Sequence, residues 1–357
     1  MISRNCIYNW SATTVLLGAS LLALPQSALA QASGSLANYE AVFQRNYPEV
    51  HALVLRLNHA QETLFGELVA EGMAVRSSPD LLPSPTFEFD MLERLGILAG
   101  EGGELDVDEG GSESGYATLG SRAAGIIEWG NQFRLAVMGI ISDPTLTEFQ
   151  ARRAKLAEAV ALYQARPEAA LPTVPKNMDI LYSHAQAQAF RTGYTDLDGL
   201  IWAGHWYKLA IAKPFVDLSG AERVAGLDTI QARYFAKLSY GDPPNFFPSE
   251  LPLAPAIAPE LSFLNPQTVA ILDNLTMFEE VIADILVSPT VPDERAGVET
   301  AVDFFLDPKR GVTTSVEFGA MALRHGIFFQ GGFPLIYMAE SERNAGGHHG
   351  GHVGGGM

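Results

Sequence analysis

The sequence predicts an all-α protein, a multi-helix antiparallel bundle, and three observations support this prediction. Apolar residues recur at helical spacing along most of the chain, as Val50, Leu53 and Leu57 do. No segment shows the strict alternation of a half-buried strand, and no Asn-Gly pair marks a hairpin. Proline, glycine and short polar caps divide the chain into pieces of helix length. Because the connections between these pieces are short, successive helices should pack antiparallel.

Residues 1–30 have the order of a secretory signal peptide. Arg4 precedes an apolar run from about Ala12 to Leu24, and small residues stand at Ala28 and Ala30. We therefore expect cleavage after Ala30 and a periplasmic or secreted protein. The apolar run is too short to cross a bilayer comfortably, so we expect no stable membrane span after cleavage.

The chain that remains after cleavage is acidic and lacks cysteine. It keeps 22 basic and 41 acidic side chains, a formal charge of −19, which argues against nucleic acid as a partner and favours cations. Cys6 leaves with the leader, so disulfides cannot stabilise the mature protein. We expect one helical domain over residues 31–343, with a candidate sub-boundary in the proline-containing segment 167–175.

The predicted helices follow each other with clear boundaries. The first runs from 36 to 72, and Pro48 kinks or restarts it because proline lacks an amide proton. Asp143-Pro144 and Asn265-Pro266 each provide an N-cap and a first-turn proline, and Gly193 provides a stop. The other predicted helices span residues 91–98, 121–142, 143–166, 177–193, 195–215, 220–240, 267–287, 292–306 and 315–330.

Two segments between these helices are irregular. Residues 99–119 are rich in glycine and acidic residues and should form an exposed loop. Residues 241–261 carry six prolines, and their aromatic residues and leucines predict a strap laid over the bundle.

Common catalytic signatures are absent from the sequence. There is no P-loop, no GxSxG, no HExxH, no CxxCH and no dinucleotide-binding glycine fingerprint. The sequence therefore leaves open whether the protein is an enzyme.

Two histidines flank a predicted helical hairpin whose turn lies at Tyr194. His184 precedes the turn by ten residues and His205 follows it by eleven, so an antiparallel hairpin would bring them level. Such a pair could bind a cofactor, either a metal ion or haem b between the two rings, or it could serve as acid and base. The alternative is that each ring packs in the core with one nitrogen bonded to a carbonyl. The sequence does not decide between them.

Acidic residues in the segment 267–287 follow a different pattern. Asp273, Glu280 and Asp284 recur on one face of the predicted helix, and apolar residues fill the other. We interpret this as the ordinary division into a solvent face and a core face.

The C-terminal residues 344–357, NAGGHHGGHVGGGM, form a glycine- and histidine-rich tail. Glycine at this density predicts disorder without a ligand. Three imidazoles, His348, His349 and His352, together with the Met357 thioether, predict a flexible metal site. Copper(II) should bind best, with nickel(II) and zinc(II) behind, and the methionine would favour copper(I).

These features support three functional hypotheses. The first is an exported protein that binds or buffers copper, nickel or zinc through its tail, with His184 and His205 as a second site. The second is a helical module that binds a small apolar ligand in an aromatic pocket. The residues of that pocket would be Trp202, Trp206, Phe246 and Phe247. The third is a b-type haem protein.

Overall fold

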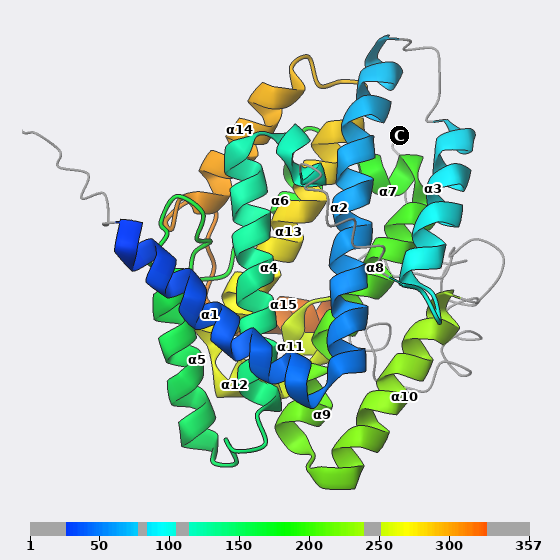
Figure 1. Ribbon diagram of the computed structural model, residues 1–357. Coiled ribbons are helices and arrows are strands. Elements are labelled where there is room, and N and C mark those ends of the chain that lie inside the picture. Colours follow the sequence, from blue (N-terminus) through cyan, green and yellow to red (C-terminus); the bar gives the residue numbers. More distant parts are fainter. Residues whose placement is uncertain (1–25, 78–83, 105–113, 239–250, 327–357) are drawn as a thin grey trace, which may run out of the picture.

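The computed structural model describes residues 26–77, 84–104, 114–238 and 251–326, and these residues confirm the all-α antiparallel bundle (Figure 1). Within them no β-strand forms, and Lys176 and Val312 make an isolated antiparallel bridge. The elements are α1 (Gln26–Asn46), α2 (Pro48–Ser77), α3 (Pro85–Ala99), η1 (Gly115–Leu119), α4 (Ser121–Ser142), α5 (Phe149–Tyr163), α6 (Ile180–Ser183), α7 (Ala189–Gly193), α8 (Thr195–Ala210), α9 (Ala212–Asp217), α10 (Gly220–Leu238), α11 (Ala254–Ile257), α12 (Pro259–Leu264), α13 (Pro266–Val287), α14 (Glu294–Leu306) and α15 (Ser315–Gly326).

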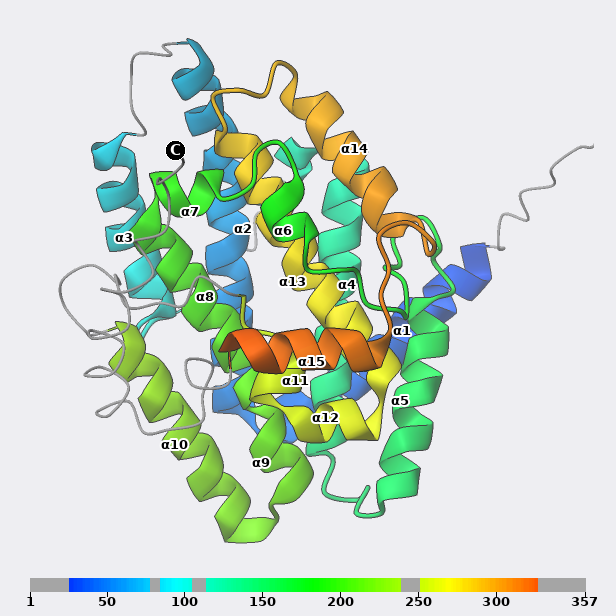
Figure 2. The same cartoon turned by 180° about the vertical axis from the view of Figure 1, so that it is seen from behind.

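Helix α13 lies at the centre of the bundle. It packs against α2, α4, α7 and α14. Figure 1 shows α4 in front of it, and Figure 2 shows it between α6 and α14. Asn265 caps its start, accepting hydrogen bonds from the backbone amides of Gln267 and Thr268, as the sequence predicts. The predicted solvent face of this helix is wrong, however. Asp273 and Asp284 are only 0% and 1% exposed, because neighbouring elements cover most of α13, whereas Glu280 of the same face is half-buried.

The two buried aspartates of α13 hold neighbouring backbone in place. The Oδ1 atom of Asp273 accepts a hydrogen bond from the amide of Ala254, the first residue of α11, at 3.0 Å. Asp284 accepts hydrogen bonds from the amides of Gln188 and Phe190, at 3.0 and 2.8 Å. These carboxylates therefore serve as caps contributed by a distant helix.

Helix α1 crosses α4 on one side of the bundle. Gly139 of α4 allows this close approach, because a Cβ atom there would overlap the carbonyl oxygen of Tyr39 in α1. Helix α1 begins at Gln26, so cleavage after Ala30 would remove its first five residues.

Several helix boundaries agree with the prediction. Helix α2 begins at Pro48, and α4 spans 121–142. The segment that follows α4 differs, since α5 begins only at Phe149. The Oδ1 atom of Asp143 accepts hydrogen bonds from the amide and the hydroxyl of Thr145, so Asp143 forms a local turn instead of a helix cap.

The predicted helix over 177–193 is wrong, and with it the predicted helical hairpin. The structure has two short helices there, α6 and α7, separated by residues 184–188. Gln188 adopts a left-handed conformation with φ of 68°, which a continuous helix does not allow. Asp284 stabilises this break because its carboxylate accepts hydrogen bonds from the backbone amides of Gln188 and Phe190, on either side of Ala189.

The segment 167–175 is attached to α13 and to the end of α14. The side-chain amide of Asn274 donates to the carbonyl oxygens of Pro172 and Val174. The ammonium group of Lys176, directly after this segment, is fully buried. It donates to the carbonyl oxygens of Phe304, Asp307 and Arg310 at 2.6 to 2.8 Å.

Some predicted features lie outside the described residues. These are the leader as far as residue 25, Phe246 and Phe247 of the predicted strap, and the whole tail with His348, His349, His352 and Met357. From residue 251 to 261 the predicted strap contains α11 and the first residues of α12.

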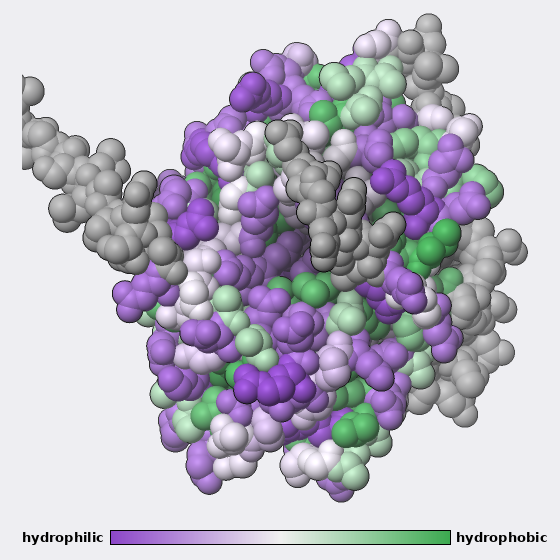
Figure 3. Space-filling view, in the orientation of Figure 1, coloured by the Kyte–Doolittle hydropathy of each residue, from purple (hydrophilic) through white to green (hydrophobic). Residues whose placement is uncertain are grey.

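The outer surface is mostly hydrophilic on the side drawn in Figure 3, where hydrophobic side chains are scattered in small groups. Among the helices described, none is both long enough and apolar enough to cross a bilayer.

Candidate binding sites inside the bundle and at its surface

A cluster of polar side chains lies inside the bundle, where four helices face one another. It contains Gln61 of α2, Arg134 of α4, His205 and Lys208 of α8, and Glu279 of α13. Each of these residues is at most 4% exposed. Such clusters in the cores of helical bundles are where cofactor and metal sites are commonly built.

His205 and Glu279 form the centre of this interior cluster. The Nε2 atom of His205 lies 3.6 Å from Oε2 of Glu279, which is too long for a hydrogen bond. Neither carboxylate oxygen of Glu279 has a hydrogen-bond partner, and Nδ1 of His205 has none. Both side chains line a cavity of about 10 Å³, together with Gln61 and Glu280. That volume is enough for one water-sized species.

Two cationic side chains complete the interior cluster. Arg134 donates from Nη1 to Asn131 at 2.6 Å, and its Nη2 lies 4.0 Å from Oε2 of Glu279. Lys208 donates to the side-chain oxygens of Asn58 and Gln61 at 3.3 and 3.2 Å.

Burial determines the protonation of the basic groups in this cluster. Burial and the charge of Arg134 lower the pKa of the Lys208 ammonium to about 7, although the Glu279 carboxylate opposes this shift. Burial, Lys208 and Arg134 together hold the pKa of His205 well below its usual value. The imidazole of His205 is therefore neutral at pH near 7, the form that binds metal ions.

His184 lies in a different environment from His205. Its Nε2 atom is 3.1 Å from Oδ2 of Asp284, the carboxylate that also holds the backbone before and within α7. Glu279 and Asp284 are five residues apart on α13, a rise of roughly 7.5 Å along the helix. The structure thus gives the two histidines separate carboxylate partners.

This geometry does not favour haem between His184 and His205. Each Nε2 atom faces a carboxylate, and the cavity beside His205 is of the size of a single water molecule. A porphyrin would need the helices to separate.

The two tryptophans of the predicted aromatic pocket are in the core. Trp202 and Trp206 are 3% and 1% exposed. The Lys237 ammonium of α10 lies 5.2 and 4.8 Å from their ring centroids, within the range of cation–π contacts. The two rings are therefore buried against α10 and do not line an open pocket.

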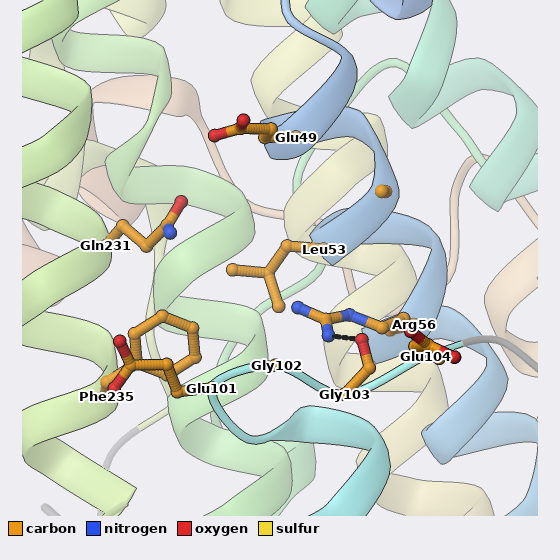
Figure 4. Close-up of a pocket in the computed structure, with 10 residues that line it drawn as sticks. Glu49, Leu53, Arg56, Glu101, Gly102, Gly103, Glu104, Gln231 and Phe235 are labelled. Atoms are coloured by element: carbon orange, nitrogen blue, oxygen red, sulfur yellow. Dashed lines mark hydrogen bonds between the residues drawn. The ribbon is translucent and has the colours of Figure 1, made fainter.

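An open cleft does exist beside α10, and Figure 4 shows it between α10 and α2. Its volume is about 650 Å³, in the range of sites for small organic molecules. Leu53 and Arg56 of α2 line one side, and Gln231 and Phe235 of α10 line the other. The segment after α3 forms its base, where the carbonyl of Gly103 accepts a hydrogen bond from Nη1 of Arg56.

The lining of this cleft is acidic. Glu49, Glu101 and Glu104 contribute three carboxylates, against one guanidinium from Arg56, a formal charge of −2. Within the described parts of the chain, no hydrogen bond or ion pair engages these three carboxylates. They are exposed and free to contact a ligand.

Sequence reasoning found His205 but missed its partners. Arg134 stands directly before the apolar run Leu135–Met138, and that signal could have identified it, because a buried polar residue usually has a role. Gln61 and Glu279 are followed by the acidic residues Glu62 and Glu280, so no local pattern marks them as buried. Among the residues described here, no three His, Cys, Asp or Glu side chains come together as a metal site.

Comparisons with protein-family models, with curated proteins and with solved structures find no match to this chain. The functional argument therefore rests on the two sites themselves.

Proposed function

We propose that this protein is an exported helical binding protein that takes a small alkylamine with two or more amino groups. The site is the cleft between α2 and α10. The observation that carries the proposal is the set of three unpaired carboxylates, Glu49, Glu101 and Glu104, around a cleft of about 650 Å³.

The chemistry of the lining fits this class of ligand. Ammonium groups form their strongest hydrogen bonds with carboxylates, and separate carboxylates can each take one amino group. Leu53 and Phe235 add apolar surface for the hydrocarbon between the amino groups. The acidic chain as a whole attracts cations and repels anions of the same size.

Transition-metal binding is the second candidate function. It was proposed from His348, His349 and His352, which lie outside the described residues. The observation that favours it here is the pairing of His205 with Glu279 in the interior cluster. Export belongs to both proposals, and an intact mass of the mature secreted protein that lacks residues 1–30 would support it.

Calorimetric titration with spermidine at low salt tests the cleft. We expect saturable binding by the wild-type protein. The double variant Glu49→Gln/Glu101→Gln should bind at least about tenfold more weakly, because each charge-assisted hydrogen bond contributes about 1.5–3 kcal/mol.

Two controls make this test specific. Glu128→Gln removes an exposed carboxylate of α4 that does not line the cleft, and it should leave binding unchanged. Suberate, a dicarboxylate of similar length, should not bind. The proposal is wrong if spermidine does not bind, or if the cleft variant and the Glu128 variant lose affinity equally.

A further inference from the structure

We propose that the small cavity beside His205 is a site for one first-row transition-metal ion, held by His205 Nε2 and the Glu279 carboxylate. The site is separate from the α2–α10 cleft and from the tail. The inference rests on the second candidate function, transition-metal binding, and its failure would leave the cleft proposal unaffected. Zinc(II) serves as the probe.

The unpartnered carboxylate is the first argument. Glu279 is 2% exposed, yet neither of its oxygens accepts a hydrogen bond. Burying a carboxylate without partners is costly, and native proteins rarely tolerate it unless an ion or water occupies the gap. The cavity that Glu279 lines has room for one such species.

The spacing of the two side chains is the second argument. Two ligand atoms about 2.1 Å from a tetrahedral zinc ion are roughly 3.4 Å apart. The 3.6 Å between His205 Nε2 and Glu279 Oε2 is close to that separation. It is longer than a direct hydrogen bond and shorter than a contact bridged by water.

A second histidine–glutamate pair, with a buried histidine and a half-buried glutamate, shows the difference. His51 of α2 is also 4% exposed, and its Nε2 lies 3.1 Å from Oε1 of Glu40. These two atoms are within hydrogen-bond distance, so no ion fits between them. His51 therefore provides a matched control for His205.

The rest of the interior cluster can complete the coordination. Gln61 lines the same cavity, and its Oε1 atom, which accepts a hydrogen bond from Lys208, keeps a second lone pair for the ion. A water molecule can fill a remaining position. The Arg134 guanidinium stays at 4.0 Å from Glu279, bonded to Asn131, so it neutralises the carboxylate without blocking both oxygens.

The experiment uses the full-length chain with His348, His349 and His352 replaced by alanine, which removes the tail imidazoles as competitors. The protein is loaded with zinc, dialysed against metal-free buffer and analysed by mass spectrometry of the metal. We expect about one zinc per chain. His205→Gln and Glu279→Gln in this background should each lower zinc retention at least about tenfold, whereas His51→Gln should not.

X-ray absorption at the zinc edge gives a readout that does not depend on these variants folding. The expected first shell holds one imidazole nitrogen and otherwise oxygen or amide ligands. The proposal is overturned if the tail-substituted chain retains no zinc, or if its zinc shell contains no imidazole. Zinc retained in full by the folded His205→Gln variant would also overturn it.

Discussion

Asp273 provides the sharpest test of the buried acids on α13. Its side chain is fully buried, Oδ1 accepts the amide of Ala254, and Oδ2 has no hydrogen-bond partner. Burial raises the pKa of Asp273 to about 8, although the Ala254 hydrogen bond and Arg134 pull it back partly. The folded protein therefore holds this carboxyl protonated at neutral pH, while the unfolded chain releases the proton above about pH 4.

The sign of the effect on stability follows from this difference. Where the unfolded chain has lost a proton that the folded chain keeps, raising the pH favours unfolding. The stability contributed by a neutral Asp273 is complete below about pH 4 and is lost progressively up to about pH 8. Asparagine keeps the Oδ1 acceptor for Ala254 and does not ionise, so Asp273→Asn should be free of this loss.

The expected magnitude can be worked out from the pKa. One pKa unit corresponds to about 1.4 kcal/mol, so over the roughly three pH units from about pH 5 to about pH 8 the wild type should lose about 4 kcal/mol relative to Asp273→Asn. Urea unfolding followed by far-ultraviolet circular dichroism at several pH values measures the difference, in which all other titrations cancel.

A matched variant shows whether burial is the cause. Asp303→Asn removes an exposed aspartate of α14 that pairs with Arg122 at 2.8 Å. Its effect should stay below about 1 kcal/mol at every pH. If the stability difference between Asp273→Asn and wild type does not change with pH, the carboxyl is not held neutral and the reasoning fails.

Two further predictions concern packing and capping. Lys176→Met should lower the free energy of unfolding by about 3 kcal/mol, because three carbonyl oxygens at the end of α14 lose their donor. Lys155→Met, which removes an exposed ion pair, should cost less than about 0.5 kcal/mol; equal costs in urea unfolding would contradict this account. Gly139→Ala should destabilise by about 1–3 kcal/mol, because its Cβ would overlap α1. Gly125→Ala, with open space around it in the same helix, should stabilise by about 0.5–1 kcal/mol, and thermal melting that gives both changes the same sign would refute the α1–α4 contact.

Local sequence signals were sufficient to predict those helix boundaries that depend only on adjacent residues. Pro48 and the Asn265-Pro266 pair fix the starts of α2 and α13, because proline and an N-cap act on the adjacent backbone. The all-α class followed from the spacing of apolar residues, which is also a local property.

Distant partners account for the errors. The break at Gln188 depends on Asp284, nearly a hundred residues later in the chain, and no local pattern announces it. The same aspartate had the spacing expected of a solvent face, since charge alone does not distinguish a buried cap from an exposed side chain.

The candidate sites show the same difference between local sequence signals and contacts with distant residues. His205 could be selected from sequence because histidine is uncommon in an apolar stretch and chemically versatile. Its placement against Glu279 depends on how α8 meets α13, which the predicted hairpin with His184 did not capture. The cleft brings together Glu49, Glu101 and Gln231 from three separate segments, so only the assembled fold could reveal it.

The central position of α13 also sets the order in which the chain can acquire its native state during synthesis. The interior faces of α2, α4 and α7 find their partner only when residues 266–287 have left the ribosome, and that is late in a chain of 357 residues. Until then the nascent polypeptide has no complete core to close around. Translation of the first two-thirds should thus yield an open intermediate whose apolar helix faces remain accessible to chaperones.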